Sequence, residues 1–305
     1  MTLLYTHPSA QGHVTPPGHP EQVARLDHVL AALQDLTLER REAPDAADAD
    51  ILRAHPPSHL AMLSQRLPRQ GWAMLDADTH MAPGSLTAAR HAVGGVCAAV
   101  DAVLAGQAAN AFVAMRPPGH HAERDRAMGF CLLSSLAIGA LRALDHHRLE
   151  RVAVLDFDVH HGNGTQDVLW NEGRALFASS HQMPLYPGTG AASERGAHDQ
   201  IVNVPLPAGS DGALARAVWR DICARVRDWQ PQLVLISAGF DAHGADPLAG
   251  LTWDEGDFAA ITRMICDCAA ECAAPVVSAL EGGYDLAALG RSARAHVEVL
   301  KESAA

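Results

Sequence analysis

The segment from Asp156 to Gly164, with the sequence DFDVHHGNG, carries the residues best suited to chemistry in this chain. It directly follows an apolar, β-branched run at 151–155 that predicts a buried strand. Side chains alternate along an extended chain, so we expect Asp156, Asp158 and His160 to point to one side of a nearly straight backbone. Two carboxylates and an imidazole converging at a strand end are costly without a partner. A divalent metal ion is the simplest partner, so the segment predicts a metal site.

Three further apolar segments lead in the same way into polar or glycine-rich residues. They are 110–115 before RPPGHH at 116–121, 232–237 before AGFD at 238–241, and 274–280 before EGGYD at 281–285. Ligand sites in open parallel α/β sheets gather beyond the carboxyl ends of the strands, so we expect all four groups to face one cleft. The alternation of strand and helix patterns predicts βαβ units, and hence an α/β fold with a mainly parallel sheet and helices on both faces.

Apolar periodicity predicts the remaining elements. Residues 1–20 resemble an edge strand followed by a loop rich in Pro, Gly and His, and a weaker strand is expected at 176–180. Helices are predicted over 21–33, within 45–67, and over 85–104, 132–144, from about 164 onward, 211–228, 254–273 and 286–301. No repeat, linker or low-complexity segment divides the chain, so residues 1–305 are expected to form a single domain.

The composition bounds the class of protein and its partners. Of the 305 residues, 48% are hydrophobic and 19% are charged, which is typical of a soluble globular protein. The net charge of −12 argues against binding to nucleic acid, which needs a basic face. No apolar run reaches the ~18 residues of a membrane span, and no targeting signal is visible. The six cysteines contain no C-x-x-C pair and predict reduced thiols in a cytoplasmic protein.

Taken together, these motifs resemble those of the histone deacetylase family. The blocks that carry the resemblance are PGHPE at 17–21, RPPGHH at 116–121, GFC at 129–131, DFDVHHGNG at 156–164, YPGTG at 186–190, AGFD at 238–241 and EGGY at 281–284. They span nearly the whole chain. The resemblance implies an arginase/deacetylase-like α/β fold and a zinc-dependent amidohydrolase. Asn163, where one branch of the family has Asp, makes the chain similar to class II and bacterial members, which are related to acetylpolyamine amidohydrolases.

The resemblance implies a metal centre with an oxyanion donor opposite it. Asp158, His160 and Asp241 would be the three ligands, leaving an open position for water and the substrate carbonyl. The open site favours Zn²⁺, although two oxygens and one nitrogen also suit Fe²⁺, Mn²⁺ or Co²⁺. Tyr284 would donate a hydrogen bond to the oxygen on which negative charge develops.

The adjacent histidines would transfer protons. The family pattern pairs His120 with Asp156 and His121 with Asn163. A carboxylate raises the pKa of an imidazole more than an amide does, so we expect the two rings to differ in protonation near neutral pH. His121 is then the general base and later the acid towards the leaving amine, and His120 is its electrostatic and orienting partner.

The resemblance further implies a tunnel for an extended acyl-lysine side chain. Phe130 and Tyr186, with Gly129 beside them, resemble its aromatic walls, although ordinary core packing is the alternative for either ring. Leu248 stands where polyamine-specialised members can place an acidic selector. A rim residue such as Asp78 could still supply a local acid.

A monovalent cation, K⁺ or Na⁺, is implied as well. Its partners would be Asp156, the backbone carbonyls of Asp158 and His160, the Ser179 hydroxyl and the Ser180 carbonyl.

These features predict a metal-dependent deacylase acting on an acylated lysine of a peptide or protein, or on a small acylated amine. A catalytically silent acyl-lysine reader is opposed by the presence of all the expected groups. An acetylpolyamine amidohydrolase is a further alternative, although the chain has little room for the long insertion of such relatives. An arginase-like ureohydrolase would need a second Asp/His cluster.

At 132–135 the chain has LLSS where the family usually has an aromatic residue and Asn, and we expect altered packing there. The oligomeric state stays open.

Overall fold

A sheet of eight parallel strands runs through residues 1–304, the part of the chain described by the computed structural model. Its strand order is β2-β1-β5-β10-β9-β6-β7-β8. The strands are β1 (Thr2–Thr6), β2 (Glu39–Glu42), β5 (Asn110–Val113), β6 (Val152–Asp156), β7 (Ala175–Gln182), β8 (Ile201–Leu206), β9 (Val234–Ala238) and β10 (Val276–Leu280). A short antiparallel pair, β3 (Ala73–Met74) and β4 (His80–Met81), lies outside this sheet. Because all strands of the large sheet are parallel, their carboxyl ends share one edge.

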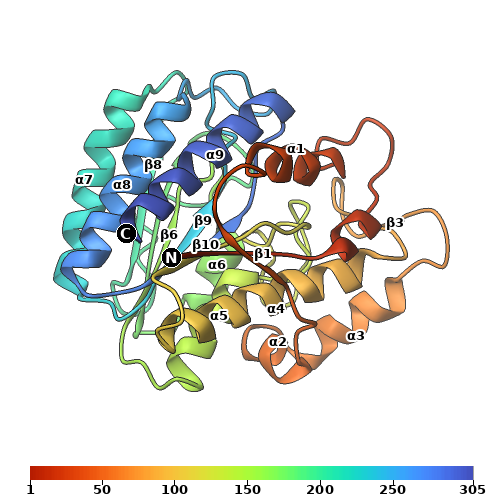
Figure 1. Ribbon diagram of the computed structural model, residues 1–305. Helices are drawn as coiled ribbons and strands as arrows, with labels where there is room; N and C mark the ends of the chain where they lie inside the picture. Colours follow the sequence, from red (N-terminus) through yellow and green to blue (C-terminus); the bar gives the residue numbers. More distant parts are fainter. Residues whose placement is uncertain (305) are drawn as a thin grey trace.

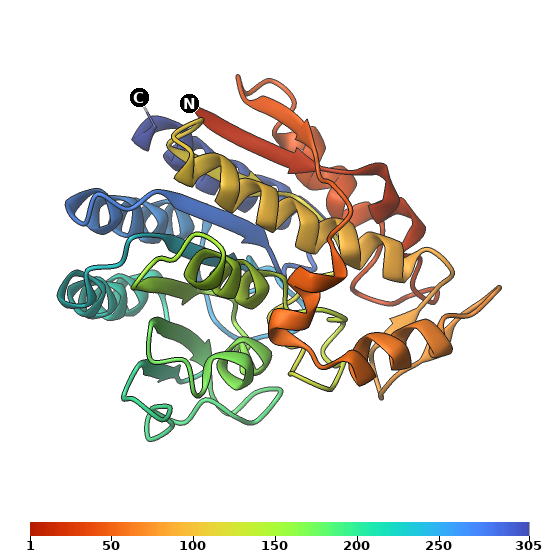
Figure 2. The same ribbon diagram turned by 90° about the horizontal axis from the view of Figure 1, so that it is seen from below.

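Helices cover both faces of the sheet (Figures 1 and 2). The helices are α1 (Ala24–Ala32), α2 (Asp48–Ala54), α3 (Pro57–Arg66), α4 (Ser85–Leu104), α5 (Ser135–Asp145), α6 (Asn163–Leu169), α7 (Gly212–Trp229), α8 (Glu255–Glu271) and α9 (Leu286–Ser303), with a 3₁₀ turn η1 (Pro8–Gly12). The layer α7-α8-α9-α1 lies on one face, and α4 and α5, flanked by α2 and α6, lie on the other. This arrangement confirms the predicted α/β fold.

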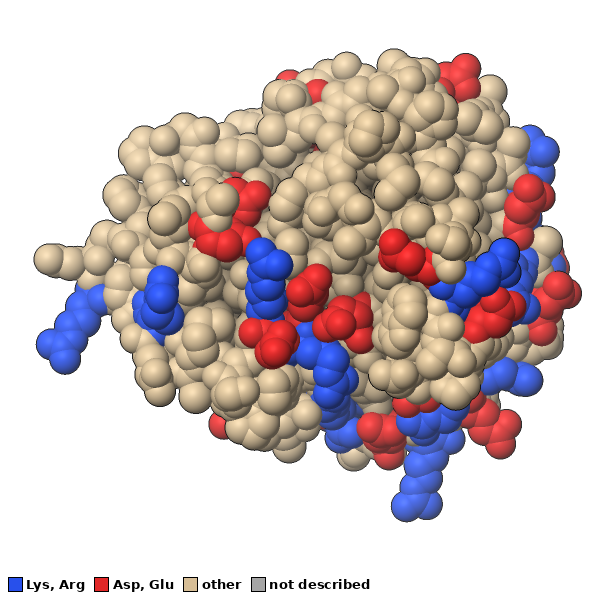
Figure 3. All heavy atoms as spheres, turned by 180° about the vertical axis from the view of Figure 1, so that it is seen from behind, with Lys and Arg blue, Asp and Glu red and all other residues tan. Residues whose placement is uncertain are grey.

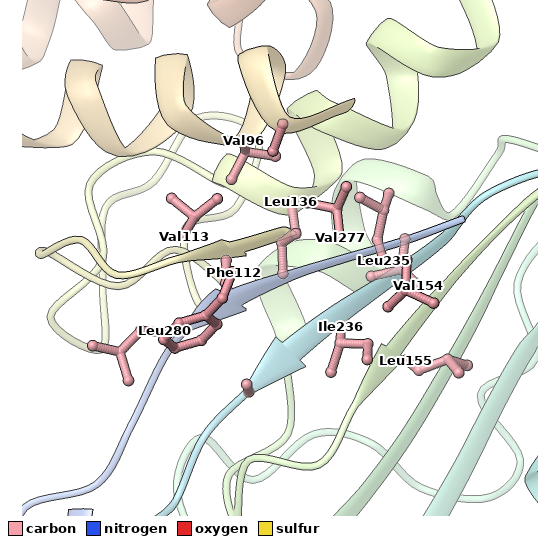
Figure 4. Close-up of a cluster of buried hydrophobic side chains, with 14 of the residues drawn as sticks. Val96, Phe112, Val113, Leu136, Val154, Leu155, Leu235, Ile236, Val277 and Leu280 are labelled. Carbon is pink, nitrogen blue, oxygen red and sulfur yellow. The ribbon is translucent and has the colours of Figure 1, made fainter. Parts of the chain in front are cut away.

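The central strands are apolar because they are buried on both sides. Every residue of β5, β6, β9 and β10 is buried, as expected for parallel strands between two helical layers. Figure 4 shows Val96 of α4 and Leu136 of α5 lying against this sheet, near Val113 and Val277. The core therefore fixes the strands whose carboxyl ends carry the predicted chemistry.

Several predicted elements need correction. Residues 2–6 do not form an edge strand, because β1 lies between β2 and β5. The edge strand is β2, whose sequence Glu-Arg-Arg-Glu has no apolar pattern; charged side chains are common on exposed edges. The opposite edge strand, β8, was also not predicted. Its sequence IVNVPL contains Pro205, which is tolerated at a sheet edge.

Helix boundaries differ where proline or polar residues intervene. The single helix predicted within 45–67 is in fact two helices, because Pro56 and Pro57 follow His55 and favour an extended backbone there. Helix α1 begins at Ala24 rather than 21, and α5 begins at Ser135 rather than 132. The helix predicted over 85–104 is confirmed as α4.

One face of the molecule carries charged side chains of both signs. Figure 3 shows basic and acidic side chains intermingled on one face of the molecule. Among the described helices, none has both the length and the hydrophobicity needed to cross a bilayer.

Gly94 allows α4 to pack closely against the segment after β2, and this contact is testable. A Cβ at this position would lie 1.9 Å from the carbonyl oxygen of Pro44. Alanine normally stabilises a helix interior relative to glycine by about 1 kcal/mol. Here we expect Gly94→Ala to lower the free energy of unfolding instead, by roughly 1–3 kcal/mol, because the backbone must shift. Chemical denaturation measures this.

Gly244→Ala is the control, since a Cβ there meets no atom closer than 3.5 Å. Equal stability of the two variants would contradict the packing argument.

Candidate active site

Three buried side chains that could hold a metal ion meet at the carboxyl edge of the sheet. Asp158 and His160 follow β6, and Asp241 follows β9, the adjacent strand. One donor atom from each lies within 4.8 Å of the others. His160 Nδ1 is 3.1 Å from Asp158 Oδ1 and 3.1 Å from Asp241 Oδ2. The structure thus brings together the three predicted ligands.

Hydrogen bonds bend the backbone that carries these ligands. Strand β6 ends at Asp156, whose Oδ1 accepts the Asp158 N–H at 3.0 Å. Asp158 Oδ1 in turn accepts the His160 N–H at 2.9 Å. The expectation of a nearly straight chain from 156 to 160 was therefore wrong. Each Asp side chain turns the chain through a local bond to a backbone amide, as Asp does in turns.

The donor set fits a divalent cation. Two carboxylates are fully buried here, and two glycines make room for them. A Cβ at Gly239 would lie 2.0 Å from Asp158 Oδ2, and a Cβ at Gly282 would lie 2.1 Å from Asp241 Oδ2. Burial lowers the pKa of His160, but the two carboxylates outweigh burial and raise it to about 10. The site therefore demands positive charge, which a divalent ion on oxygen and nitrogen ligands supplies.

Two adjacent histidines lie beside this cluster. His120 Nδ1 is 3.0 Å from Asp156 Oδ2, and His121 Nδ1 is 2.7 Å from Asn163 Oδ1. Their ring centroids are 4.0 Å apart. The structure therefore contains the two pairs that the family pattern implies.

The surroundings of the two rings shift their pKa values in opposite directions. Burial lowers the pKa of His120, but Asp158 and Asp156 outweigh it and raise the pKa well above its usual value. Burial, His120 and His160 lower the pKa of His121 well below its usual value. These surroundings therefore favour the charged form of His120 and the neutral form of His121.

Glu281, which was not predicted as a site residue, holds the loop that carries these histidines. Its Oε2 accepts the backbone N–H groups of Gly119 at 2.7 Å and of His120 at 3.1 Å. Burial raises the pKa of its carboxyl group to about 7. The Glu-Gly-Gly-Tyr motif contained this residue, but nothing in the local sequence indicates that it reaches another strand end.

Tyr284 is held at its ring and at its backbone. Arg25 lies over it, with Cζ 4.9 Å from the ring centroid, and donates to the carbonyls of Glu281 at 2.5 Å and Gly283 at 2.6 Å. Asp246 Oδ2 accepts the Tyr284 N–H at 2.6 Å. Burial raises the pKa of Tyr284 well above its usual value, so its hydroxyl stays protonated and can donate.

A buried ion-pair network fixes Arg25 in turn. Glu21 accepts from Arg25 at 3.0 Å and binds Arg116 in bidentate fashion at 2.5 and 2.6 Å. His13 Nε2 lies 3.2 Å from the same carboxylate. The PGHPE and RPPGHH motifs thus contact each other through Glu21 and Arg116, and a long-range contact of this kind is not evident from the sequence.

A cavity of about 240 Å³ opens onto these groups. Its lining residues are Pro20, Asp78, His121, Gly129, Phe130, His160, Leu185, Tyr186, Leu248 and Tyr284. The set includes every predicted tunnel residue. The ring centroids of Phe130 and Tyr284 are 5.7 Å apart, and those of Tyr186 and His121 are 5.2 Å apart. Aromatic side chains therefore flank the catalytic candidates, in keeping with the predicted tunnel.

The predicted monovalent-cation residues lie on β6 (Asp156), on β7 (Ser179 and Ser180) and in the loop after β6 (Asp158 and His160). Asp156 and Ser179 are direct neighbours in the two strands, and both are buried. Ser179 Oγ is 2.9 Å from His181 Nδ1, and Ser180 Oγ accepts from Trp219 at 3.1 Å. The cation site stays a prediction.

The divergent segment at 132–135 is held by two stacked histidines. His55 Nε2 accepts the Ser134 N–H at 2.9 Å, and His59 Nε2 lies 2.9 Å from the Leu132 carbonyl. Burial lowers the pKa of His55 to about 4, so the ring is neutral and can accept. Hydrogen bonds to two stacked histidines thus hold this segment, and the altered packing expected from its sequence stays a prediction.

Comparison with known proteins identifies the family. The model of the histone deacetylase domain matches residues 19–300. The chain belongs to the histone deacetylase family. A histone deacetylase-like amidohydrolase of Pseudomonas aeruginosa is 40% identical over 285 residues, covering 91% of this chain and 74% of that protein. A probable deacetylase of Archaeoglobus fulgidus is 35% identical, covering 94% and 82%. The crystal structure of the HDA15 HD domain has a TM-score of 0.92 at 30% identity, covering 98% and 87%.

The Asp158–His160–Asp241 cluster of this histone deacetylase domain yields a direct prediction. Asp158→Ala or Asp241→Ala should abolish metal retention and hydrolysis of acylated substrate together, because each removes a third of the ligand set. Elemental analysis and rates on one sample check this. Asp221→Ala, an exposed acid on α7, should change neither. Full activity in a metal-free Asp241→Ala protein would remove the assignment.

Proposed function

We propose that this chain is a zinc-dependent amidohydrolase that removes acetyl or related acyl groups from the side chains of N-acyl-lysine residues. The observation that carries the proposal is the buried Asp158–His160–Asp241 cluster beside a cavity lined by His121 and Tyr284. A donor group, a base and a metal-ligating set in one aromatic-lined cavity suit hydrolysis of an amide. The silent acyl-lysine reader gains no support from a site with all of these groups.

The metal would be held by one carboxylate oxygen each of Asp158 and Asp241 and by His160 Nδ1. When bound, such an ion polarises the scissile carbonyl and makes water more acidic. Three ligands with an open position favour Zn²⁺, with Fe²⁺, Mn²⁺ and Co²⁺ as competitors for the same donors. We also propose a structural K⁺ or Na⁺ ion at Asp156 and Ser179, between β6 and β7.

His121 acts as the general base and then as the general acid. Its Nδ1 faces the Asn163 carbonyl oxygen, so the neutral ring leaves Nε2 free to take a proton from the attacking water. The same nitrogen then returns the proton to the leaving amine. His120 stays charged beside Asp156 and offsets negative charge that develops on the substrate.

Tyr284 stabilises the oxyanion. Tyr284 lines the cavity, and its protonated hydroxyl would donate a hydrogen bond to the carbonyl oxygen as charge builds on it. Arg25 and Asp246 hold the ring and the backbone in place, so little reorganisation is needed during the reaction.

Substrate class follows from the lining of the cavity. Phe130 and Tyr186 would bury the four methylenes of a lysine stem, each contributing about 0.8 kcal/mol. Leu248 adds apolar surface where an acid would suit a polyamine. Asp78, however, also lines the cavity, and burial together with Asp76 raises the pKa of its carboxyl group.

The role of Tyr284 is testable by removing one oxygen. Tyr284→Phe should lower kcat by ~10²–10³, the usual cost of one oxyanion donor, and leave metal content unchanged. A trifluoroacetyl-lysine substrate, whose carbonyl is already activated, should lose less. Steady-state rates on acetyl and trifluoroacetyl peptides measure both effects.

Tyr5→Phe is the matched control, because the Tyr5 hydroxyl bonds to the Ala98 carbonyl within the core and lies outside the cavity lining. An equal loss on both substrates would count against the oxyanion role of Tyr284. A normal rate would exclude it.

Substrate preference is tested by comparing two substrates at one ionic strength. We expect a higher kcat/KM for an acetyl-lysine peptide than for N8-acetylspermidine. The internal ammonium of the polyamine needs a carboxylate to offset its desolvation, and Leu248 supplies none. A clear preference for the polyamine, lost in Asp78→Asn, would favour a small-molecule amidohydrolase instead.

A further inference from the structure

Asn163 is held at both ends of its side-chain amide. His121 Nδ1 lies 2.7 Å from Asn163 Oδ1, and Asn163 Nδ2 donates to Glu123 Oε1 at 2.7 Å. A second acceptor, Met128 Sδ, lies 3.4 Å from the same Nδ2. The amide thus forms a link between a half-buried carboxylate and the ring that faces the cavity.

The hydrogen-bonding capacity of Glu123 and His121 determines the orientation of the Asn163 amide. A carboxylate can only accept hydrogen bonds, so Glu123 requires the NH₂ end of the amide. The oxygen end must then face His121, and an oxygen can only accept, so the ring carries its proton on Nδ1. We propose that Glu123 is a positioning residue that fixes the Asn163 amide and, through it, the Nδ1–H tautomer of His121. This inference rests on the proposed function.

The reversed amide would be harmful to the reaction. With Nδ2 turned towards His121, the amide would donate to Nδ1 and the ring proton would move to Nε2. That nitrogen could then not take a proton from water. An Asp side chain at position 163 would not have this ambiguity, because both of its oxygens accept. An amide at position 163 therefore needs a second residue that fixes its orientation, whereas a carboxylate does not.

Local packing keeps Glu123 within reach of Asn163. The Glu123 N–H donates to the Arg126 carbonyl at 2.9 Å, and the Thr165 N–H donates to the His120 carbonyl at 3.1 Å. A Cβ at Gly164 would lie 2.3 Å from the Ala122 carbonyl oxygen. The start of α6 and the 120–123 segment are thus in direct backbone contact.

The test is a double-mutant cycle on the full chain loaded with metal. Glu123→Gln keeps the shape of the side chain but can offer either a donor or an acceptor, so the direction is lost. We expect kcat on an acetyl-lysine peptide to fall roughly tenfold to hundredfold, the range for lost outer partners of a site, with little change in KM. In the Asn163→Asp background, Glu123→Gln should leave kcat unchanged. Asp125→Asn, an exposed acid two residues away, is the charge-matched control and should keep normal kcat.

A second readout does not depend on turnover. The ¹⁵N shifts of the His121 ring nitrogens, assigned with His121→Ala, distinguish the Nδ1–H from the Nε2–H tautomer. We expect Nδ1–H in the natural protein and a mixture in Glu123→Gln. Equal losses of kcat in both backgrounds, or an unchanged tautomer in Glu123→Gln, would overturn the inference. If the natural protein hydrolysed no acyl-lysine substrate, the proposed function would fail, and the tautomer would still decide the role of Glu123.

Discussion

Burial of several carboxylates at one edge of the sheet is the constraint on which the site depends. An isolated buried carboxylate is very costly, so each must find donors or positive charge. Asp158 Oδ2 accepts the Gly282 N–H at 2.8 Å, and Asp241 Oδ1 accepts the Val159 N–H at 2.9 Å. These bonds tie the loops after β6, β9 and β10 to one another. The charges that would hold a metal therefore also fix the backbone around it, and only glycine leaves room at positions such as 282.

A second group of buried charged side chains lies behind these carboxylates. Glu21 joins Arg116 to Arg25, and Arg25 holds the loop that ends in Tyr284. This network is fully buried and bidentate on Arg116, so loss of one member would leave an unpaired charge. The network connects the N-terminal segment, through Glu21 and Arg25, to the loop after β10. The N-terminal segment thus supports the candidate active site, although its sequence suggested only an edge strand and a loop.

The parts of the fold that were predicted share a physical cause. Strands β5, β6, β9 and β10 are buried on both faces, so their sequences are apolar runs that end in distinctive motifs. Edge strands β2 and β8 lack that signal, and Pro56 divided an expected helix. Convergence of Asp158, His160 and Asp241 was predicted, but the local bonds that bend the backbone were not. Arg25, Asp246 and Glu123 act through long-range or indirect contacts, which no local pattern in the sequence reveals.

The central claim is that one divalent ion at Asp158, His160 and Asp241 is required for amide hydrolysis. It is tested most directly by removing metal from the natural protein with a chelator and titrating Zn²⁺ back while following hydrolysis of an acetyl-lysine peptide. The account predicts that activity disappears with the metal and returns in proportion to occupancy, saturating at one catalytic ion per chain. A metal-free protein that hydrolyses the peptide at an undiminished rate would contradict it.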